Sequence, residues 1–167
     1  RSRWRERKKT GLTPEAERCR DRADRAQHVA EVIRPALACG TSVLCDRYVD
    51  STIAYQGYGR GFEPSWLLEL NKTAVQGLFP DLTFLIDLDP KTGLKRALTR
   101  NEQESKTVSE GRFEAESLHF HTRVRQGFLT LAEQFPERYR IVDGANNPEK
   151  VLEQALLILD TEYETSF

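Results

Sequence analysis

Charged side chains follow short apolar segments of the sequence, and these residues are the ones that could do chemistry. Asp46 and Arg47 come directly after the apolar segment 42–45. An arginine guanidinium presents a planar fork of donors that suits phosphate oxygens, and a carboxylate at the end of a strand can support Mg²⁺ in phosphoryl transfer. The same pattern recurs at Asp87, Asp89 and Asp143. For an Asp-Arg pair in isolation, capping of the next helix is the simpler interpretation.

Apolar residues at helical spacing predict the elements that would position these groups. Thr13, Pro14 and Glu15 are typical of a helix start, and the helix is expected to end near Gly40, with a kink at Pro35. Further helices are predicted over 51–58, after Pro64, from Pro90, through about 113–135, and over 148–159 with Val151, Leu152, Ala155 and Leu159 inward.

Three short apolar segments, 42–45, 82–87 and 139–142, are predicted strands of a buried sheet. Strands that alternate with helices favour a parallel sheet with helices on both faces. In such folds the ligand binds beyond the carboxyl ends of the strands, where the charged residues above fall. The spacing therefore predicts an α/β protein with a polar site at one sheet edge, and it does not identify the ligand.

Composition narrows the class of protein. The chain has 167 residues, a formal net charge of −1 and a pI near 6.4, which give no overall electrostatic case for nucleic-acid binding. No apolar run is long enough to span a membrane. Three cysteines without metal spacing suit a reducing compartment. We therefore expect a cytoplasmic protein that binds neither membranes nor nucleic acid.

The charge is uneven along the chain. Residues 1–28 hold ten Lys and Arg against five Asp and Glu, and much of this excess lies in the opening RSRWRERKK. A nucleic-acid arm is one interpretation of this basic run. Charged segments with few apolar residues tend to stay disordered, so we predict a disordered basic tail over residues 1–11.

The segment 46–61, DRYVDSTIAYQGYGRG, resembles the signature of the bacterial thymidylate kinase family. The stretches 24–37, 80–90 and 111–132 resemble the same family in order and spacing, so residues 12–167 are expected to form a partial thymidylate kinase domain. The resemblance implies a P-loop NTPase-like, three-layer fold. It also implies transfer of the ATP γ-phosphoryl group to dTMP to give dTDP, for dTTP synthesis, with ATP and Mg²⁺ as cofactors and a homodimeric assembly.

The resemblance also implies roles for particular residues. Arg25 and Arg47 match the arginines that bind the dTMP phosphate, although a surface salt bridge with Asp21 is an alternative for Arg25. Tyr55 matches the aromatic that packs under the deoxyribose, or it could simply belong to the core. The remaining positions matched to dTMP are Ser51 and Thr52, near the thymine ring, and Gln56, whose amide suits a base edge.

A polar stretch at 101–112 matches the lid that closes over ATP. Its candidate cations are Arg100, Lys106 and Arg112, with a solvated linker as the alternative for Lys106. The turn 143–147, with Ala145 and Asn146, resembles the loop that the family lays against adenine. The catalytic set implied by the resemblance is Arg47, Arg112 and Asp46, and Asp46 is also the possible, indirect support for Mg²⁺.

The sequence also departs from the family pattern. No GxxxxGK[ST] loop occurs, so the sheet is expected to lack its first two strands, including the central P-loop strand. Asp21 occupies the position of the family's thymine-stacking phenylalanine, within the charge-rich turn 18–22. Three functions stay open: a dTMP kinase whose activity needs the missing part, a non-catalytic nucleotide-binding remnant, and a structural partner.

Overall fold

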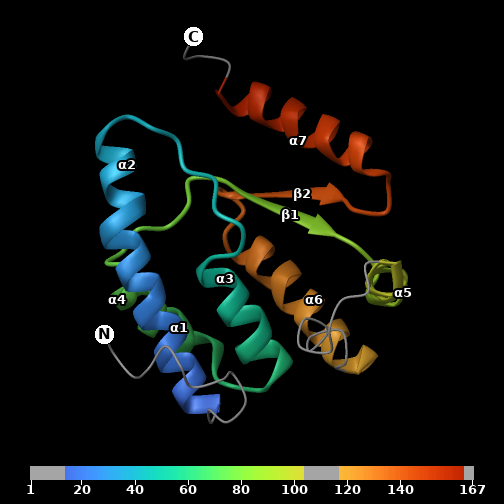
Figure 1. Cartoon of the computed structure of the whole chain (residues 1–167), viewed down its shortest axis with the longest axis horizontal. Coiled ribbons are helices and arrows are strands. Elements are labelled where there is room, and N and C mark those ends of the chain that lie inside the picture. Colours follow the sequence, from blue (N-terminus) through green and yellow to red (C-terminus); the bar gives the residue numbers. More distant parts are fainter. Residues whose placement is uncertain (1–13, 104–116, 164–167) are drawn as a thin grey trace. The chain divides into compact units, whose positions relative to one another are not determined.

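The structure is a computed structural model that describes residues 14–103 and 117–163 (Figure 1). The described chain forms two compact units. The first unit contains the residues up to 46 together with 68–79, and the second contains 47–67 and the residues from 80 onward. The predicted tail at 1–11 lies outside the described residues.

One helical run opens the first unit, as the sequence predicts. Its segments are α1 (Pro14–His28), η2 (Val29–Ile33) and α2 (Arg34–Ala38), and Gly40 follows with a φ of +73°. The middle segment is a π-helical stretch, in which the Arg34 N–H donates to the Val29 carbonyl five residues back. Proline has no N–H to continue the regular pattern. The irregularity expected at Pro35 is therefore a π-helical stretch that directly precedes it.

The predicted strand at 42–45 is wrong. Residues 41–45 have no regular secondary structure, and the Leu44 side chain is 96% exposed. A strand needs a neighbour to accept and donate its backbone hydrogen bonds. The sheet of the described residues has two strands, neither of which is this segment. An apolar sequence without a paired neighbour thus stays an exposed segment without regular secondary structure.

The two other predicted strands are confirmed. They are β1 (Thr83–Asp87) and β2 (Tyr139–Asp143), which pair in parallel so that Asp87 lies level with Asp143. The carboxyl ends of both strands therefore meet at one edge. Their predicted burial is only partly correct, because Val142 is fully buried whereas Ile86 and Ile141 are 58% and 53% exposed.

The second unit also contains helices. They are α3 (Val49–Thr52), η3 (Ile53–Gly59), α5 (Pro90–Gln103), α6 (Leu118–Gln134) and α7 (Pro148–Tyr163), while α4 (Pro64–Ala74) crosses from the second unit into the first. In Figure 1, α6 and α7 lie on opposite sides of β1 and β2. This arrangement confirms a parallel sheet with helices on both faces. Ala54, Phe120 and Val124 form a buried cluster between η3 and α6.

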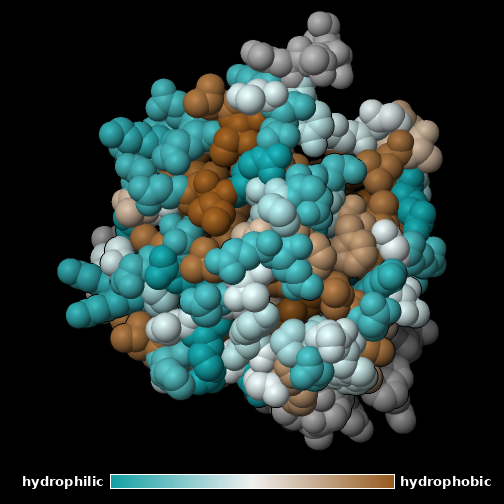
Figure 2. Space-filling view, turned by 180° about the vertical axis from the view of Figure 1, so that it is seen from behind, coloured by the Kyte–Doolittle hydropathy of each residue, from teal (hydrophilic) through white to brown (hydrophobic). Residues whose placement is uncertain are grey.

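The apolar face of α7 differs from the prediction. Leu152 and Leu159 were expected inward, yet they are 58% and 36% exposed, and no residue of α7 is buried. Figure 2 shows apolar side chains gathered over this helix, at its upper left. Because the sheet formed by the described residues has two strands, α7 has little sheet surface on which to bury this face. Among the described residues, no helix combines the length and apolar content needed to cross a membrane.

Candidate functional site

Arg47 has a strained backbone conformation. Its φ is +64°, in the left-handed region that side-chain-bearing residues rarely adopt. Its guanidinium carbon lies 5.2 Å from the centre of the Tyr55 ring, within the range of a cation–π contact. The turn before α3 thus directs an exposed cation over the aromatic face of a residue eight positions further along the chain.

Tyr55 packs into the core, which is one of the two interpretations that the sequence left open. Its ring lies 6.2 Å from the Phe120 ring and 6.2 Å from the Phe128 ring, and it packs against the buried cluster of η3 and α6. The ring is half-buried. The Tyr55 ring therefore packs against the core through Phe120 and Phe128, and one of its faces contacts the Arg47 guanidinium.

The predicted base-binding residues lie on the same helical segment. Ser51 and Thr52 end α3 and are half-buried. Gln56 follows in η3, and its Oε1 is buried without a hydrogen-bond partner in the described part of the chain. An unpaired buried carbonyl oxygen costs free energy unless a donor reaches it. A ligand that carries an N–H group would supply that donor.

A buried ion pair that sequence reasoning missed anchors this segment. Arg138 donates to both Asp50 carboxylate oxygens at 2.7 and 2.8 Å, and to the Thr83 hydroxyl at 3.1 Å. Asp50 and Arg138 are 5% and 7% exposed. The pair ties α3 to the beginning of the sheet, just before Ser51. No local pattern marks it, because its partners lie 88 residues apart.

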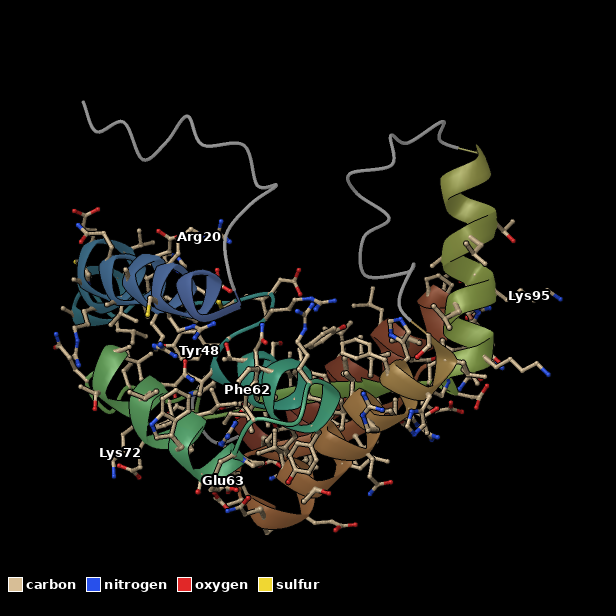
Figure 3. All side chains as sticks on the ribbon, turned by 90° about the horizontal axis from the view of Figure 1, so that it is seen from below. Arg20, Tyr48, Phe62, Glu63, Lys72 and Lys95 are labelled. Carbon is tan, nitrogen blue, oxygen red and sulfur yellow. The ribbon has the colours of Figure 1, made fainter. Side chains whose placement is uncertain are left out.

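Arg25 and Asp46 lie in the first unit. The Arg25 guanidinium donates to the side chain of the fully buried Asn71, whereas Asp21 pairs with Arg20, which points outward from α1 in Figure 3. The contact to Asn71 favours a positioned Arg25 over a surface bridge to Asp21. Residues 18–22 are helical, so the charge-rich turn keeps the expected helix.

The pKa of the Cys45 thiol is affected by the charges of Arg25 and Asp46. Partial burial raises the pKa of the Cys45 thiol, the Arg25 charge lowers it, and the Asp46 carboxylate raises it again. The side chains of Arg25 and Asp46 therefore both act on the end of segment 41–45. This is the end at which the sequence predicted a polar site.

Asp87, at the end of β1, is held by an arginine that the sequence analysis did not single out. The Nε and Nη2 atoms of Arg125 each donate to one carboxylate oxygen at 2.7 Å. This bidentate hydrogen bond, with the charge of Arg125, outweighs partial burial and lowers the pKa of Asp87. Asp87 is thus committed to a salt bridge within the unit.

The turn 143–147 has a defined shape at the end of β2. The Asp143 carboxylate accepts hydrogen bonds from the Ala145 N–H and the Asn146 side-chain amide, both at 2.9 Å. The Asn147 side chain accepts the Lys150 N–H and so caps α7. These contacts place Ala145 and Asn146 at the sheet edge predicted for adenine.

The lid residues are only partly described. Arg100 belongs to α5. Lys106 and Arg112 lie outside the described residues, as does most of the predicted lid at 101–112.

Asp46 is the residue that the sequence analysis matched to Mg²⁺ support, and its side chain is exposed. Among residues 14–103 and 117–163, no three His, Cys, Asp or Glu side chains gather as a metal site. Magnesium in phosphoryl transfer is commonly held by one or two carboxylates and by substrate phosphate oxygens. Asp46 would therefore be a ligand only together with a bound phosphate.

Comparison with known proteins identifies the family. The family model for thymidylate kinase matches residues 6–155. The chain is 60% identical to a thymidylate kinase of Oleidesulfovibrio alaskensis, over 86% of this chain and 68% of that protein. It is 57% identical to one of Nitratidesulfovibrio vulgaris, over 90% of this chain and 67% of that protein.

The fold agrees with these sequence matches. The crystal structure of a thymidylate kinase from Ehrlichia chaffeensis matches with a TM-score of 0.64 and 30% identity, covering 90% of this chain and 67% of that one. The present chain therefore spans about two thirds of the length of its relatives. The residues matched include the strained Arg47, the half-buried Tyr55 and the turn after β2. The chain belongs to the thymidylate kinase family.

Proposed function

We propose that this chain carries the dTMP-binding part of a kinase that transfers the γ-phosphoryl group of ATP to dTMP, giving dTDP for dTTP synthesis. The observation that carries the proposal is Arg47, strained at φ +64° and stacked over Tyr55 at the start of the α3–η3 segment. The guanidinium offers a planar pair of donors to a phosphate. The aromatic face beneath the guanidinium suits a deoxyribose. The buried Oε1 of Gln56 could accept a hydrogen bond from an N–H donor such as that of thymine.

The remaining roles follow the family resemblance. Arg25 is proposed as a second phosphate ligand, with Asn71 fixing its guanidinium. Ser51 and Thr52 are proposed to contact the base. Arg100, Lys106 and Arg112 are proposed lid residues, and Arg47 and Arg112 would counter the charge of the phosphoryl group in transfer.

Asp46 is the proposed support for Mg²⁺. When bound, this ion neutralises charge on the β- and γ-phosphate oxygens of ATP. The chain's own contribution is to present a carboxylate next to the phosphate-binding Arg47 in sequence. The exposed Ala145 and half-exposed Asn146 are proposed to receive adenine.

The isolated 167-residue chain is expected to have negligible kinase activity. Phosphoryl transfer depends on positioning and charge stabilisation, and no GxxxxGK[ST] loop that would cradle the ATP phosphates occurs in the sequence. A coupled assay for ADP release, with dTMP, ATP and Mg²⁺, should show no turnover above background. Turnover near one per second would contradict this expectation.

Calorimetric titration separates the alternatives. A kinase part or a non-catalytic nucleotide-binding remnant should bind dTMP, whereas a purely structural partner should bind neither dTMP nor ATP. A longer gene product with a phosphate-cradling loop, active in the same assay, would favour the kinase over the remnant. Failure of the chain to bind dTMP would refute the proposed function.

Assembly and location are part of the proposal. A homodimer is proposed from the family resemblance, and sedimentation of the purified chain at several concentrations tests it. A cytoplasmic location is proposed because Cys19, Cys39 and Cys45 form no disulfide in the described part of the chain, as expected in a reducing compartment.

A further inference from the structure

Arg96 joins α5 to the turn after β2. Its Nη1 donates to the Gly144 carbonyl at 2.7 Å and its Nη2 donates to the Ala145 carbonyl at 2.8 Å. The two acceptors are consecutive in sequence and lie 48 and 49 residues after Arg96. One planar guanidinium thus bridges two neighbouring peptide groups with short, charge-assisted hydrogen bonds.

The other side of the same turn is pressed against β1. The Gly144 N–H donates to the Asp87 carbonyl at 2.8 Å. A Cβ at Gly144 would lie 2.8 Å from that oxygen and 2.9 Å from Cγ2 of Ile86, so only glycine fits. The turn is therefore fixed against the sheet on one side, and Arg96 fixes it on the other.

The hydrogen bonds within the turn complete this arrangement. The Ala145 N–H is taken by the Asp143 carboxylate, so the N–H and carbonyl groups of both Gly144 and Ala145 have partners. What the turn offers a ligand is then the Ala145 methyl group and those polar groups of Asn146 that its hydrogen bond to Asp143 does not use. Loss of Arg96 would free two carbonyls and release one side of the turn.

We propose that Arg96 is a positioning residue for the nucleobase of ATP: its guanidinium holds the turn 143–147 in the shape that receives the base. This inference rests on the proposed function of the turn. Arg96 also lies one helical turn before Arg100, where α5 leads toward the predicted lid. The same helix thereby fixes the turn and carries the start of the lid.

The test compares Arg96→Met and Arg96→Lys in the full chain, with Lys95→Met as the matched control. Lys95 lies on the same helix and extends away from it in Figure 3, so its replacement removes an equal charge without touching the turn. Calorimetry measures ATP and dTMP affinity for each variant. Amide hydrogen exchange of residues 144–147 in the nucleotide-free chain measures the order of the turn directly.

Arg96→Met is expected to weaken ATP binding about tenfold, the loss typical of a charge-assisted contact, with dTMP affinity unchanged within about twofold. The turn amides should exchange at least about fivefold faster. The ATP affinity and the exchange rates of Arg96→Lys should lie between those of Arg96→Met and those of the parent, because an ammonium keeps the charge but lacks the planar fork of donors. Lys95→Met should match the parent in all three measurements.

Two results in the variants would overturn the proposal. One is unchanged ATP affinity and unchanged exchange in Arg96→Met, and the other is an equal loss of ATP and dTMP affinity with a lower melting temperature, which indicates a purely structural role. If the parent chain binds dTMP but no ATP, the assignment of the turn to a nucleobase fails, while faster exchange in Arg96→Met would still assign the turn's shape to Arg96. If the parent binds neither nucleotide, the proposed function itself fails.

Discussion

At the scale of single residues, Arg47 combines three properties that rarely coincide. It has a left-handed backbone, an exposed guanidinium and an aromatic ring beneath the charge. A non-glycine residue in this conformation costs about 1–2 kcal/mol, which the surrounding structure must offset. Strain of this kind is often retained where a side chain must point in one direction for function.

Arg47→Ala should weaken dTMP binding about ten- to a hundredfold, because a charge-assisted contact to phosphate is worth about 1.5–3 kcal/mol. Arg47→Gly removes the same guanidinium and also relieves the backbone strain. It should therefore bind dTMP as weakly as Arg47→Ala does, but its melting temperature should be higher than that of Arg47→Ala. Calorimetry and thermal unfolding of both variants provide the measurement. Parental dTMP affinity in either variant would exclude Arg47 from phosphate binding.

At the scale of elements, packing between helices is closest where glycines face aromatic rings. A Cβ at Gly127, in α6, would lie 2.6 Å from atoms of the Tyr58 ring in η3. A Cβ at Gly93, in α5, would meet only Leu88 at an ordinary 3.5 Å. The two helical glycines therefore differ in packing rather than in helix propensity.

Gly127→Ala should lower the free energy of unfolding by about 1–3 kcal/mol, since overpacking displaces the Tyr58 ring. Gly93→Ala, the matched change in open surroundings, should raise it by about 0.5–1 kcal/mol because alanine favours the helix. Urea titrations of both variants measure the difference. Equal effects at the two positions would mean that η3 moves away from α6 without cost.

Local patterns predicted much of the secondary structure. The helix beginning at Pro14, the strand ending at Asp87 and the helix from Pro148 follow from capping, apolar runs and turn residues. The strand at 42–45 was predicted on the same grounds and is absent, because strand formation depends on a neighbour that local sequence cannot supply. The exposure of Leu152 has the same cause.

Residues of the candidate site could be predicted only where they belong to a recognisable sequence motif. The segment 46–61 led to Arg47, Tyr55 and Gln56. The supports of the site, Arg138 with Asp50 and Arg125 with Asp87, join residues 88 and 38 positions apart. Side chains so distant in sequence leave no periodic signal, so their roles emerge only from the folded structure.

At the scale of the whole molecule, acid should weaken the fold through the Asp87–Arg125 pair. The pKa of Asp87 is lowered in the folded state by its hydrogen bonds to Arg125. Its contribution is therefore fully present above the unfolded pKa of about 3.9 and is lost as pH falls through the lower folded value. Because Arg125 is 39% exposed, the contribution should not exceed about 1 kcal/mol.

Asp87→Asn is the variant that isolates this contribution. Its melting temperature should lie below that of the parent at pH 7, and the gap should narrow at pH values below about 4. Thermal unfolding followed by circular dichroism across this range measures both quantities. A gap that stays constant down to pH 2 would mean that the Asp87 charge contributes nothing.

The exposed segment 41–45 makes the folded chain susceptible to proteolysis. Leu44, 96% exposed and outside regular structure, offers a backbone that a protease can bind as an extended strand. Brief digestion with thermolysin should cleave beside Leu44, and Leu44→Asp should abolish that cut. After cleavage, α1 and α2 remain held to residues 68–79 by the bonds from Arg25 to Asn71 and from Arg34 to the Gln76 carbonyl. The nicked protein should therefore run as two fragments on a denaturing gel and elute as one species from a sizing column.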